Sequence, residues 1–311
     1  MKIAITGALG HIGSRLIHSL QPGDFDEVLL LDNLSTQRQC SLFNLPAGVR
    51  FHFVECDVCD ADLHALLSQA HAVVHLAAIT DAARSFERPE EVERVNLIGT
   101  QRVAQACADL GCRLIFPSTT SVYGSQSAVV DESCGLEELK PQSPYAESKL
   151  HAEQHLASLH AKQGLRCMTL RLGTIFGVSI GMRFHTAVNK LTWQACLGLP
   201  LTVWRTALHQ QRPYLELGDA VRALRFVIDR DLFDGRLFNV LSLNATVDDI
   251  VQVLRRHVPT LAVALVDSRI MNQLSYTVDC SRFRDLGFAF QGRLEQGIGE
   301  TVEWLVGVHR G

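Results

Sequence analysis

The chain has 311 residues, of which 47% are hydrophobic and 20% are charged. This balance is typical of a globular protein with a sizeable core, and it excludes disordered, collagen-like and coiled-coil chains. Lys and Arg number 29 against 33 Asp and Glu, a formal net charge of −4 with no long basic run. Nucleic acid and an anionic membrane are therefore not expected as partners.

Short apolar runs alternate with helical patterns over residues 1–175. Most of the runs are continuously apolar, as expected for strands buried on both faces of a parallel sheet. This alternation predicts an α/β protein with a doubly wound, Rossmann-like parallel sheet. The expected strands are Lys2–Thr6, Glu27–Asp32, Arg50–Glu55, Ala72–Ala77, Arg113–Ser118 and Arg166–Leu172, and the expected helices lie near 11–20, 60–69, 88–110 and 145–162.

The pattern changes after Gly177. Residues 178–213 are expected to be irregular, and short strands are expected at Tyr214–Leu217 and Leu237–Val240. No Pro/Gly/Ser linker separates the two halves, so a smaller lobe packed against the sheet edge is expected.

The C-terminal region carries two helical patterns. Thr246-Val-Asp-Asp249 resembles a capping box that opens a helix ending near His257. A last helix is expected over 294–306. The expected domains are a Rossmann-like domain over 1–175, to which 214–240 returns, and a smaller lobe formed by 176–213 and 241–311.

A glycine-rich turn follows the first strand. Gly7, Gly10 and Gly13 stand three residues apart between that strand and the first helix. Glycine there permits a tight turn, close approach of the backbone to a pyrophosphate and close helix–strand packing. Free amides at the helix N-terminus favour the phosphates.

An acidic residue follows at the distance that dinucleotide binding requires. Asp32 ends the second strand, 19 residues after Gly13. Its carboxylate can accept hydrogen bonds from the ribose hydroxyls of NAD and would repel the 2′-phosphate of NADP. Capping of the turn after the strand is the alternative role, and Arg38 leaves NADP open as the cofactor.

Tyr145 and Lys149 are spaced i and i+4, so on a helix they share a face. A free tyrosine has a pKa of about 10, and a nearby ammonium group lowers that value by stabilising the phenolate. A cluster of hydroxyl groups from Ser118 to Tyr123 ends a strand just before this pair. A hydroxyl there can bind a reacting alcohol or carbonyl.

Taken in order, these motifs resemble the extended short-chain dehydrogenase/reductases, the NAD-dependent sugar-nucleotide epimerase/dehydratase family that includes UDP-glucose 4-epimerase. The motifs that carry the resemblance are Gly7-x-x-Gly10-x-x-Gly13, Asp32, Cys56-Asp57-Val58, His75-Leu-Ala-Ala78, Asn96, Ser118–Gly124, Tyr145-x-x-x-Lys149 and Arg212–Asp219.

The resemblance implies roles for individual residues. Tyr145 would be the catalytic base, Lys149 its partner, and Thr119 the catalytic hydroxyl. The implied NAD-binding residues are Gly7, Gly10, His11, Ile12, Gly13, Asp32, Asn33, Ser35, Asp57, Val58, Leu76, Ala77, Ala78, Asn96, Ser118, Tyr145, Lys149 and Leu172. The implied substrate-binding residues are Thr80, Thr119, Thr174, Arg183, His185 and Arg212, of which Arg212 would bind the substrate diphosphate.

Two departures from the family pattern bear on the reaction. Many dehydratases of the family carry an acid where this chain has Thr120 and Ser121, which disfavours a 4,6-dehydratase. Thr174 stands where sugar-nucleotide members usually have an Asn that touches the diphosphate.

The expected enzyme is a nucleotide-sugar epimerase acting at C4 through a transient 4-keto sugar. A nucleotide-sugar dehydrogenase or 4-ketoreductase would use the same residues and stays open, as does a non-catalytic NAD sensor. By resemblance, helices over 88–110 and 145–162 would pair two subunits in a homodimer.

A serine hydrolase is a competing interpretation from another enzyme class. Gly177-Val-Ser179-Ile-Gly181 matches a nucleophile elbow, and Asp219 and His257 could complete a triad. The glycine-rich turn is unexplained by this interpretation.

Metal and disulfide sites are not expected. Cys56 and Cys59 form a single C-x-x-C, and His151 and His155 lack an evident third ligand. The nine cysteines are odd in number and irregularly spaced, which is typical of reduced thiols in a cytoplasmic protein. No leader pattern and no apolar run of about 18 residues is present.

Overall fold

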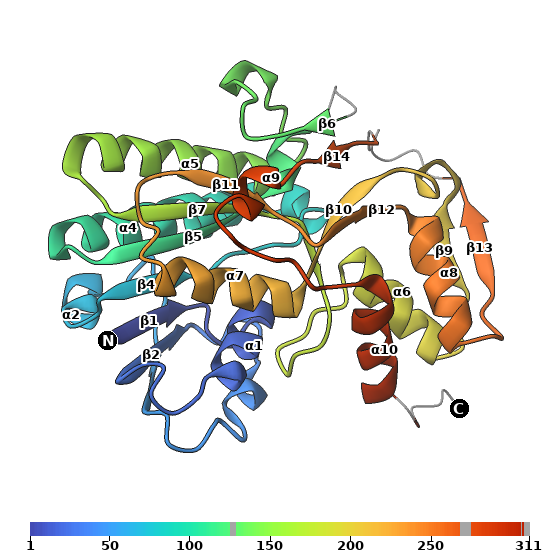
Figure 1. The fold of residues 1–311 in the computed structure, drawn as a ribbon, viewed down its shortest axis with the longest axis horizontal. Helices are drawn as coiled ribbons and strands as arrows, with labels where there is room; N and C mark the ends of the chain where they lie inside the picture. The colour runs from blue at the N-terminus through green and yellow to red at the C-terminus, as the bar shows by residue number, and fades with distance from the viewer. Residues whose placement is uncertain (125–128, 268–274, 306, 308–311) are drawn as a thin grey trace.

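A parallel sheet of seven strands forms the centre of the molecule (Figure 1). The computed structural model describes residues 1–124, 129–267, 275–305 and 307. The strand order is β11-β7-β5-β4-β1-β2-β3, and each neighbouring pair is parallel. The strands are β1 (Lys2–Thr6), β2 (Glu27–Asp32), β3 (Phe51–Glu55), β4 (Ala72–His75), β5 (Arg113–Thr119), β7 (Cys167–Leu172) and β11 (Leu237–Val240).

The central strands β4 and β7 are buried along their whole length, as expected for strands of a parallel sheet that is covered on both faces. All six strands predicted for the first 175 residues are present, with bounds within two residues of those expected. The predicted fold class, a Rossmann-like doubly wound sheet, is confirmed.

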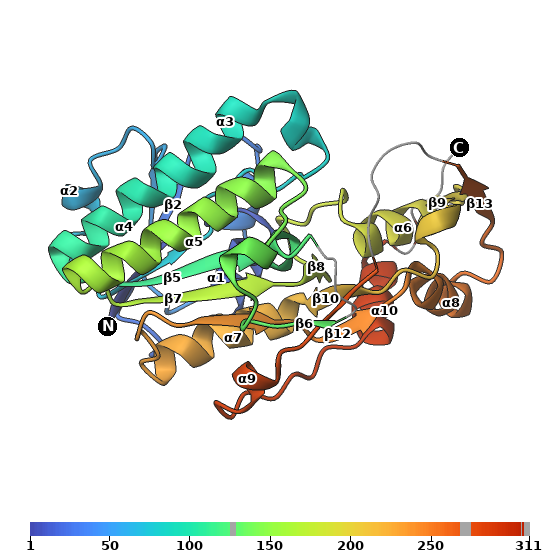
Figure 2. The same cartoon turned by 90° about the horizontal axis from the view of Figure 1, so that it is seen from above.

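Helices cover both faces of this sheet (Figure 2). On one face α1 (His11–Ser19) packs against α7 (Leu217–Asp229). The other face carries α2 (Leu63–Leu67), α3 (Pro89–Glu93), α4 (Gly99–Leu110) and α5 (Pro144–Gln163). A separate apolar core lies on each face, one around Leu16 and Leu224 and the other around Val103 and Leu156.

Beside the large sheet lies a second group of elements with its own core, which includes Phe176, Leu191, Ile250 and Ile298 (Figure 1). The predicted capping box is confirmed, because Thr246 and Asp249 each bond the other's backbone N–H at 3.1 and 2.8 Å. The elements of this group are β8 (Thr174–Phe176), β10 (Arg212–Glu216) and β12 (Leu243–Ala245) in one sheet, the pair β9 (Leu201–Trp204) with β13 (Val263–Val266), and the helices α6 (Ala187–Cys196), α8 (Val247–His257) and α10 (Leu294–Trp304). The pair β6 (Val129–Val130) with β14 (Thr277–Val278) belongs to a smaller core around Tyr123, and α9 (Ser281–Arg284) packs against β11 of the large sheet.

Part of the prediction for residues 178–213 is wrong, because α6 and β9 lie in this stretch. Val188, Leu191 and Ala195 recur with helical spacing and are buried. Polar residues among them obscure the pattern in the sequence. The strand predicted at Tyr214–Leu217 is also misplaced, since β10 ends at Glu216, whose carboxylate caps the following helix α7 by accepting from the N–H of Asp219 at 3.1 Å.

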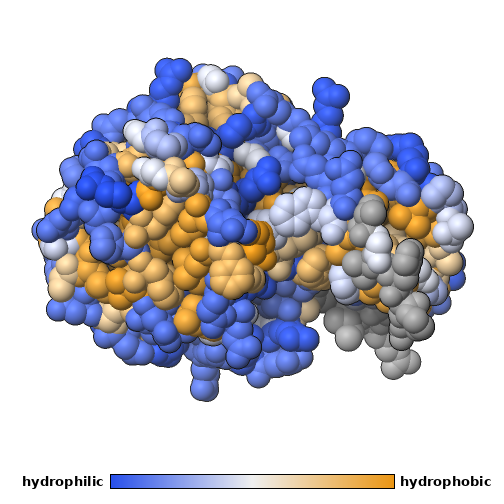
Figure 3. All heavy atoms as spheres, turned by 90° about the horizontal axis from the view of Figure 1, so that it is seen from below, coloured by the Kyte–Doolittle hydropathy of each residue, from blue (hydrophilic) through white to orange (hydrophobic). Residues whose placement is uncertain are grey.

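The surface mixes hydrophilic and apolar side chains, and the face seen from below carries apolar groups within the large-sheet half of the molecule (Figure 3). Within the part of the chain that the structure describes, no helix combines the length and the apolar character needed to cross a membrane.

Candidate active site

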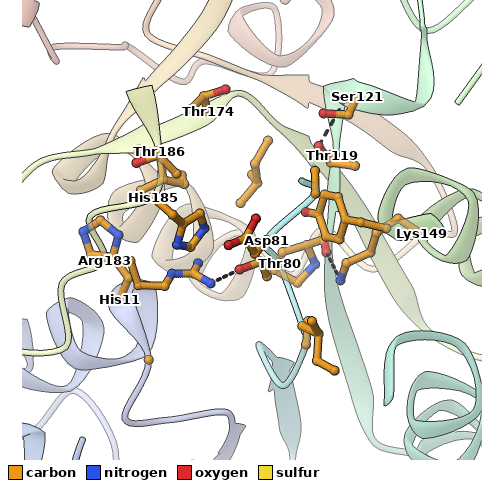
Figure 4. Close-up of a pocket in the computed structure, with 18 of the residues that line it drawn as sticks. His11, Thr80, Asp81, Thr119, Ser121, Lys149, Thr174, Arg183, His185 and Thr186 are labelled. Atoms are coloured by element: carbon orange, nitrogen blue, oxygen red, sulfur yellow. Dashed lines mark hydrogen bonds between the residues drawn. The ribbon is translucent and has the colours of Figure 1, made fainter. Parts of the chain in front are cut away.

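A cavity of about 590 Å³ lies at the carboxyl ends of the central strands, between the large sheet and the second group of elements (Figure 4). Ligands of open parallel α/β sheets bind at this edge. Every site residue expected from the sequence lines the cavity except Asn96. The fold therefore brings together residues that stand up to 205 positions apart, from Gly7 to Arg212.

The glycine-rich turn has the geometry of a phosphate loop. Gly7 has φ +63°, and a Cβ there would lie 2.6 Å from the backbone N of Ala77. A Cβ on Gly13 would lie 2.4 Å from the carbonyl oxygen of Ala8, so both positions admit only glycine. The N–H groups of His11, Ile12 and Gly13 open α1 and face the cavity without an intrahelical partner. The loop therefore fits a dinucleotide pyrophosphate.

Asp32 serves the turn and the cavity together. Its carboxylate accepts the N–H of Leu9 at 3.0 Å and that of Leu34 at 2.9 Å, while the side chain also lines the cavity. These bonds hold the glycine-rich turn, residues 7–13, called the glycine loop below, against the end of β2. Capping of the turn after β2, the alternative role expected for Asp32 from the sequence, therefore occurs together with its position in the cavity wall. Arg38 is half-buried nearby, where burial lowers its pKa and the charge of Asp32 opposes that shift.

Asp57 and Val58 follow β3 and line the same end of the cavity. Asp57 accepts the N–H of Cys59 at 2.9 Å and lies 3.5 Å from the guanidinium of Arg94. The C-x-x-C pair carries free thiols, and the Cys59 thiol donates to the Arg94 carbonyl at 3.3 Å. Burial raises the pKa of Cys59 to about 11. Over the described ranges no three His, Cys, Asp or Glu side chains gather as a metal site.

A buried histidine holds the chain that follows β4. His75 accepts from the Thr6 hydroxyl at 2.7 Å through Nδ1 and donates to Thr100 at 3.0 Å through Nε2. Burial, aided by the charge of Lys149, lowers the pKa of His75 to about 3. The neutral ring fixes the start of the Leu76–Ala78 segment, which forms one wall of the cavity.

Asn96 does not touch the cavity and acts behind it. Its amide accepts the N–H of Ile79 at 2.8 Å and donates to the Ile79 carbonyl at 2.9 Å and to Ser148 at 3.1 Å. Asn96 lies in a π-helical turn, Arg94–Ile98, between α3 and α4, and such turns often mark functional sites. The expected cofactor contact of Asn96 is therefore corrected to a brace between the cavity wall and α5.

Helix α5 carries the phenol–ammonium pair. The helix begins at Pro144 because the Ser143 hydroxyl accepts the N–H of Ala146 at 3.2 Å and proline suits the first position. Tyr145 then stands in the first turn and lines the cavity together with Thr119 at the end of β5. Burial raises the pKa of Tyr145, whereas the neighbouring Thr119 hydroxyl and the positive charge of Arg183 lower it.

Lys149 is buried one turn further along α5. Its ammonium group donates to the Pro117 carbonyl at 2.9 Å and lies 4.5 Å from the centre of the Phe116 ring. Burial lowers its pKa to about 7, and the nearby Glu153 carboxylate opposes this shift. Lys149 is therefore poised to gain or lose a proton near neutral pH.

Glu153 is a residue that the sequence analysis does not single out. It forms an ion pair of 2.7 Å with Arg171 in which each side chain is 6% exposed, and it accepts from the Ser118 hydroxyl. Ser118 also lines the cavity, where the resemblance places a cofactor contact; its hydroxyl donates to Glu153, and the cofactor contact stays a prediction. The sequence does contain a sign of this residue's role, because Glu153 stands one helical turn after Lys149.

The segment after β8 is fastened to the glycine loop. The His11 ring donates to the Gly177 carbonyl at 2.9 Å, and the Ser179 hydroxyl donates to the His11 carbonyl at 3.0 Å. The N–H of Gly181 reaches the Ser14 hydroxyl at 3.0 Å. Burial, with the charge of Arg183, lowers the pKa of His11 to about 3. His11 therefore contributes its backbone to the phosphate loop and an uncharged ring to this junction.

This geometry contradicts the serine hydrolase interpretation. Ser179 is buried and engaged with His11, so it is not an exposed elbow nucleophile. Asp219 accepts the N–H groups of Gln291 and Gly292 at 3.0 and 2.8 Å, and His257 lies 3.1 Å from Glu295. Each candidate triad member has a separate structural role.

The expected substrate residues lie on two walls of the cavity (Figure 4). Thr80 follows β4 and receives a hydrogen bond from Arg183, which lies beside His185 in the segment before α6. Thr174 opens β8. Arg212 opens β10, and its guanidinium stacks 5.1 Å from the centre of the Tyr276 ring. Residues that line the cavity and that the sequence analysis does not single out include Asp81, Trp204, Gln210 and Tyr276.

Similar proteins of known name are enzymes of nucleotide sugars. A UDP-glucose 4-epimerase of Mycolicibacterium smegmatis is 33% identical over 321 residues, covering 98% of each chain. A dTDP-glucose 4,6-dehydratase of Streptomyces niveus is 28% identical, covering 98% of this chain and 92% of the relative. The solved UDP-glucuronic acid 4-epimerase from Bacillus cereus, in complex with UDP-glucuronic acid and NAD, matches with a TM-score of 0.87 at 26% identity over 98% of this chain and 99% of that one.

The family model described as the NAD dependent epimerase/dehydratase family matches residues 3–240, which is more than half of the chain. The motifs on which the family resemblance of the sequence rests, from Gly7 to Asp219, lie within these residues. The chain belongs to the NAD dependent epimerase/dehydratase family.

Proposed function

We propose that this protein is a nucleotide-sugar epimerase that inverts C4 of its substrate with NAD as an internal cofactor. The observation that carries the proposal is that Thr119, Tyr145 and Lys149 line the same cavity as the glycine loop. A proton acceptor, its hydroxyl partner and a dinucleotide loop are the parts that reversible oxidation of an alcohol requires.

Family membership makes the chain an enzyme of a NAD-dependent class. Support for C4 chemistry comes from the relative described as a UDP-glucose 4-epimerase and from the solved UDP-glucuronic acid 4-epimerase. Both of these proteins are named for UDP-sugars, so a uridine diphosphate sugar is the first substrate class to test.

The described residues fit NAD. The amides of His11, Ile12 and Gly13 would hold the pyrophosphate, Asp32 the adenosine ribose, and Asp57 with Val58 the adenine end. NAD, when bound, oxidises the sugar carbon to a ketone and reduces it again. The residues of the chain supply orientation and proton transfer.

The proton step belongs to Tyr145. Its phenolate oxygen takes the proton of the sugar hydroxyl, and its phenol returns the proton when the alcohol forms again. The Thr119 hydroxyl accepts the N–H of Ser121 at 3.1 Å, which leaves its own hydrogen free to donate toward the phenolate or the sugar oxygen. The positive charge of Arg183 favours the phenolate, and an ammonium group at Lys149, on the same face of α5, would add to this effect.

Elimination of water is not supported by the end of β5. Thr120 is buried and its hydroxyl donates to the Leu172 carbonyl at 3.3 Å, while Ser121 lines the cavity with a second hydroxyl. A 4,6-dehydratase needs an acid and a base that act on the carbon next to the ketone. This strand end provides neither, so epimerisation is favoured.

Two further properties form part of the proposal. Exposed apolar side chains at Phe86 and Ile98, beside α3 and at the start of α4, support a homodimer that pairs the α4–α5 face. Nine free cysteines support a reducing, cytoplasmic location.

A deuterium label tests the reaction. The purified protein is incubated with UDP-glucose or UDP-glucuronic acid that carries deuterium at C4, and the products are separated by chromatography and weighed by mass spectrometry. We expect the 4-epimer with its deuterium retained, together with near-stoichiometric NAD released on unfolding. A ketone product with accumulation of reduced NAD in solution would instead identify a dehydrogenase, and the epimerase proposal would be wrong.

A further inference from the structure

Arg183 brings a positive charge into the cavity without an acidic partner. Its guanidinium donates to the Thr80 hydroxyl, and its buried Nε has no hydrogen-bond partner among the described residues. The ion pairs within the described ranges do not include Arg183. Asp81 lines the same cavity and its charge raises the pKa of Arg183, but its carboxylate is engaged with Arg84: it accepts the N–H of Arg84 at 3.1 Å and lies 3.8 Å from its guanidinium. Arg183 is partly buried, and a cation in such a place is stabilised when a ligand supplies a matching negative charge.

The backbone that carries Arg183 is preorganised. Asn189 donates to the Arg183 carbonyl at 2.9 Å and accepts the N–H of Gly177 at 3.2 Å, which closes the segment into a loop. Gly181 packs so closely on the glycine loop that a Cβ there would lie 2.4 Å from the Leu9 carbonyl oxygen. The loop is therefore held at both ends, and Arg183 is directed into the cavity by the fold.

The guanidinium stands across the cavity from the reacting groups. Figure 4 shows Arg183 and Thr80 opposite Thr119 and Lys149. The charge of Arg183 acts on the Tyr145 phenol and on Lys149, which places it within electrostatic reach of both. Arg212 lies at the start of β10 and is the cation expected to meet the substrate diphosphate. Arg183 is thus available for a different anion.

We infer that Arg183 binds a carboxylate at C6 of the sugar, so that the preferred substrate is a nucleotide-diphosphate hexuronic acid. The inference rests on the proposed function and deepens it. C6 is attached to C5, the neighbour of C4, so a sugar whose C4 oxygen lies at Tyr145 presents its C6 group beside the reacting oxygen. The forked guanidinium matches a carboxylate with two parallel hydrogen bonds, and the Thr80 hydroxyl can contribute a third.

A neutral hexose would bind the same site less well. Its C6 hydroxyl offers one acceptor and no charge, so the guanidinium would stay buried without a counterion. Selectivity for the acid therefore follows from the cost of leaving Arg183 unmatched. The pyrophosphate of the cofactor is the other anion in reach, because Arg183 also influences His11.

The test compares two substrates on NAD-loaded, full-length protein. Formation of the 4-epimers of UDP-glucuronic acid and UDP-glucose is followed by anion-exchange chromatography for wild type, Arg183→Met and Arg183→Lys. Arg84→Gln is the matched control, since it removes an exposed arginine next to Asp81 that does not line the cavity. NAD content after unfolding is measured for every variant.

We expect wild type to favour UDP-glucuronic acid by about tenfold or more in kcat/KM, as a charge-assisted hydrogen bond permits. Arg183→Met should lower kcat/KM for both substrates, because the Tyr145 phenolate loses a nearby positive charge, but the loss for the acid should be larger by about 10-fold or more, with NAD content unchanged. Arg183→Lys should retain part of the preference, and Arg84→Gln all of it.

Other results would overturn the inference. Equal losses for both substrates together with lost NAD would assign Arg183 to the cofactor pyrophosphate, and a wild-type preference for UDP-glucose would exclude a carboxylate site. If neither sugar is epimerised, the proposed function fails, and calorimetric binding of UDP-glucuronic acid and UDP-glucose decides the inference separately. Equal affinities would then disprove it, and a preference for the acid lost in Arg183→Met would support it.

Discussion

Thr119 and Tyr145 line the same cavity from two different elements, Thr119 at the end of β5 and Tyr145 in the first turn of α5. They are 26 residues apart in the sequence. The Thr119 oxygen is held by the N–H of Ser121, and Tyr145 is held by a capped helix start, so neither group has to move far to meet a substrate oxygen. This preorganisation places a proton acceptor and a hydrogen-bond donor at one point of the cavity.

Replacement of Tyr145 by Phe is expected to lower kcat by about 10²- to 10⁴-fold, because a positioned general base contributes that much. The phenyl ring keeps the packing, so NAD content and melting temperature should stay near wild type. Thr119→Val should lower kcat by about tenfold or more, and Thr119→Ser should retain most of it. Steady-state assays of epimer formation measure these effects, and a Tyr145→Phe enzyme with wild-type kcat would exclude Tyr145 as the base.

The pH dependence of the reaction reports on Lys149. Activity should rise with pH as Tyr145 loses its proton, since the phenolate is the active form. An ammonium group at Lys149 would favour the phenolate, so Lys149→Met should move the rising part of the pH–activity profile to higher pH by about one unit, equivalent to ~1.4 kcal/mol. Lys149→Arg keeps the charge and should move this rise in activity less. Profiles of kcat against pH measure these shifts. If kcat of Lys149→Met rises at the same pH as that of wild type, the charge of Lys149 does not support the phenolate.

The buried Glu153–Arg171 pair supports the site from behind. Glu153→Gln leaves Arg171 buried without its counterion, and we expect a loss of about 3–5 kcal/mol in the free energy of unfolding. The double variant Glu153→Gln with Arg171→Met removes the stranded charge and should recover part of that loss. Urea unfolding measures both. Glu295→Gln, in the exposed pair with Arg256, is the control and should leave the urea midpoint unchanged; a similar midpoint shift in this control would show that burial is not the cause.

Acid should destabilise the cofactor-free protein through its buried histidines. Burial lowers the pKa values of His11 and His75 to about 3 from an ordinary value near 6.5. Between these values the unfolded chain binds protons that the folded chain does not, so stability falls as pH falls, at most by about 1.4 kcal/mol per pH unit and histidine.

Unfolding free energies at pH 7, 6, 5 and 4 test this expectation. His75→Gln should be less stable than wild type at pH 7 yet show a shallower loss of stability toward pH 4. His52→Gln removes an exposed histidine and should keep the wild-type slope. A His75→Gln slope as steep as that of wild type would mean that other groups cause the acid sensitivity.

The glycine loop, Asp32 and the Tyr145–Lys149 pair could be located in the sequence because each depends on local geometry. A turn that excludes Cβ atoms and a helix face with i, i+4 spacing leave their mark within a few residues. The direction of the Ser118 hydroxyl could not be predicted, because it depends on Glu153 and Arg171, which come from α5 and β7. The partners of Asn96, Ile79 and Ser148, likewise come from distant parts of the chain and are set by the tertiary structure.

The sequence by itself determined the Rossmann-like class, the NAD-type loop and the family, because apolar runs and motif spacings encode strands, turns and helix faces directly. Tertiary structure alone decided which charges meet. Only packing of the 177–189 segment on the glycine loop buries Ser179 and directs Arg183 into the cavity. Burial and partners set the charge state and direction of a side chain, and both depend on residues far apart in the chain.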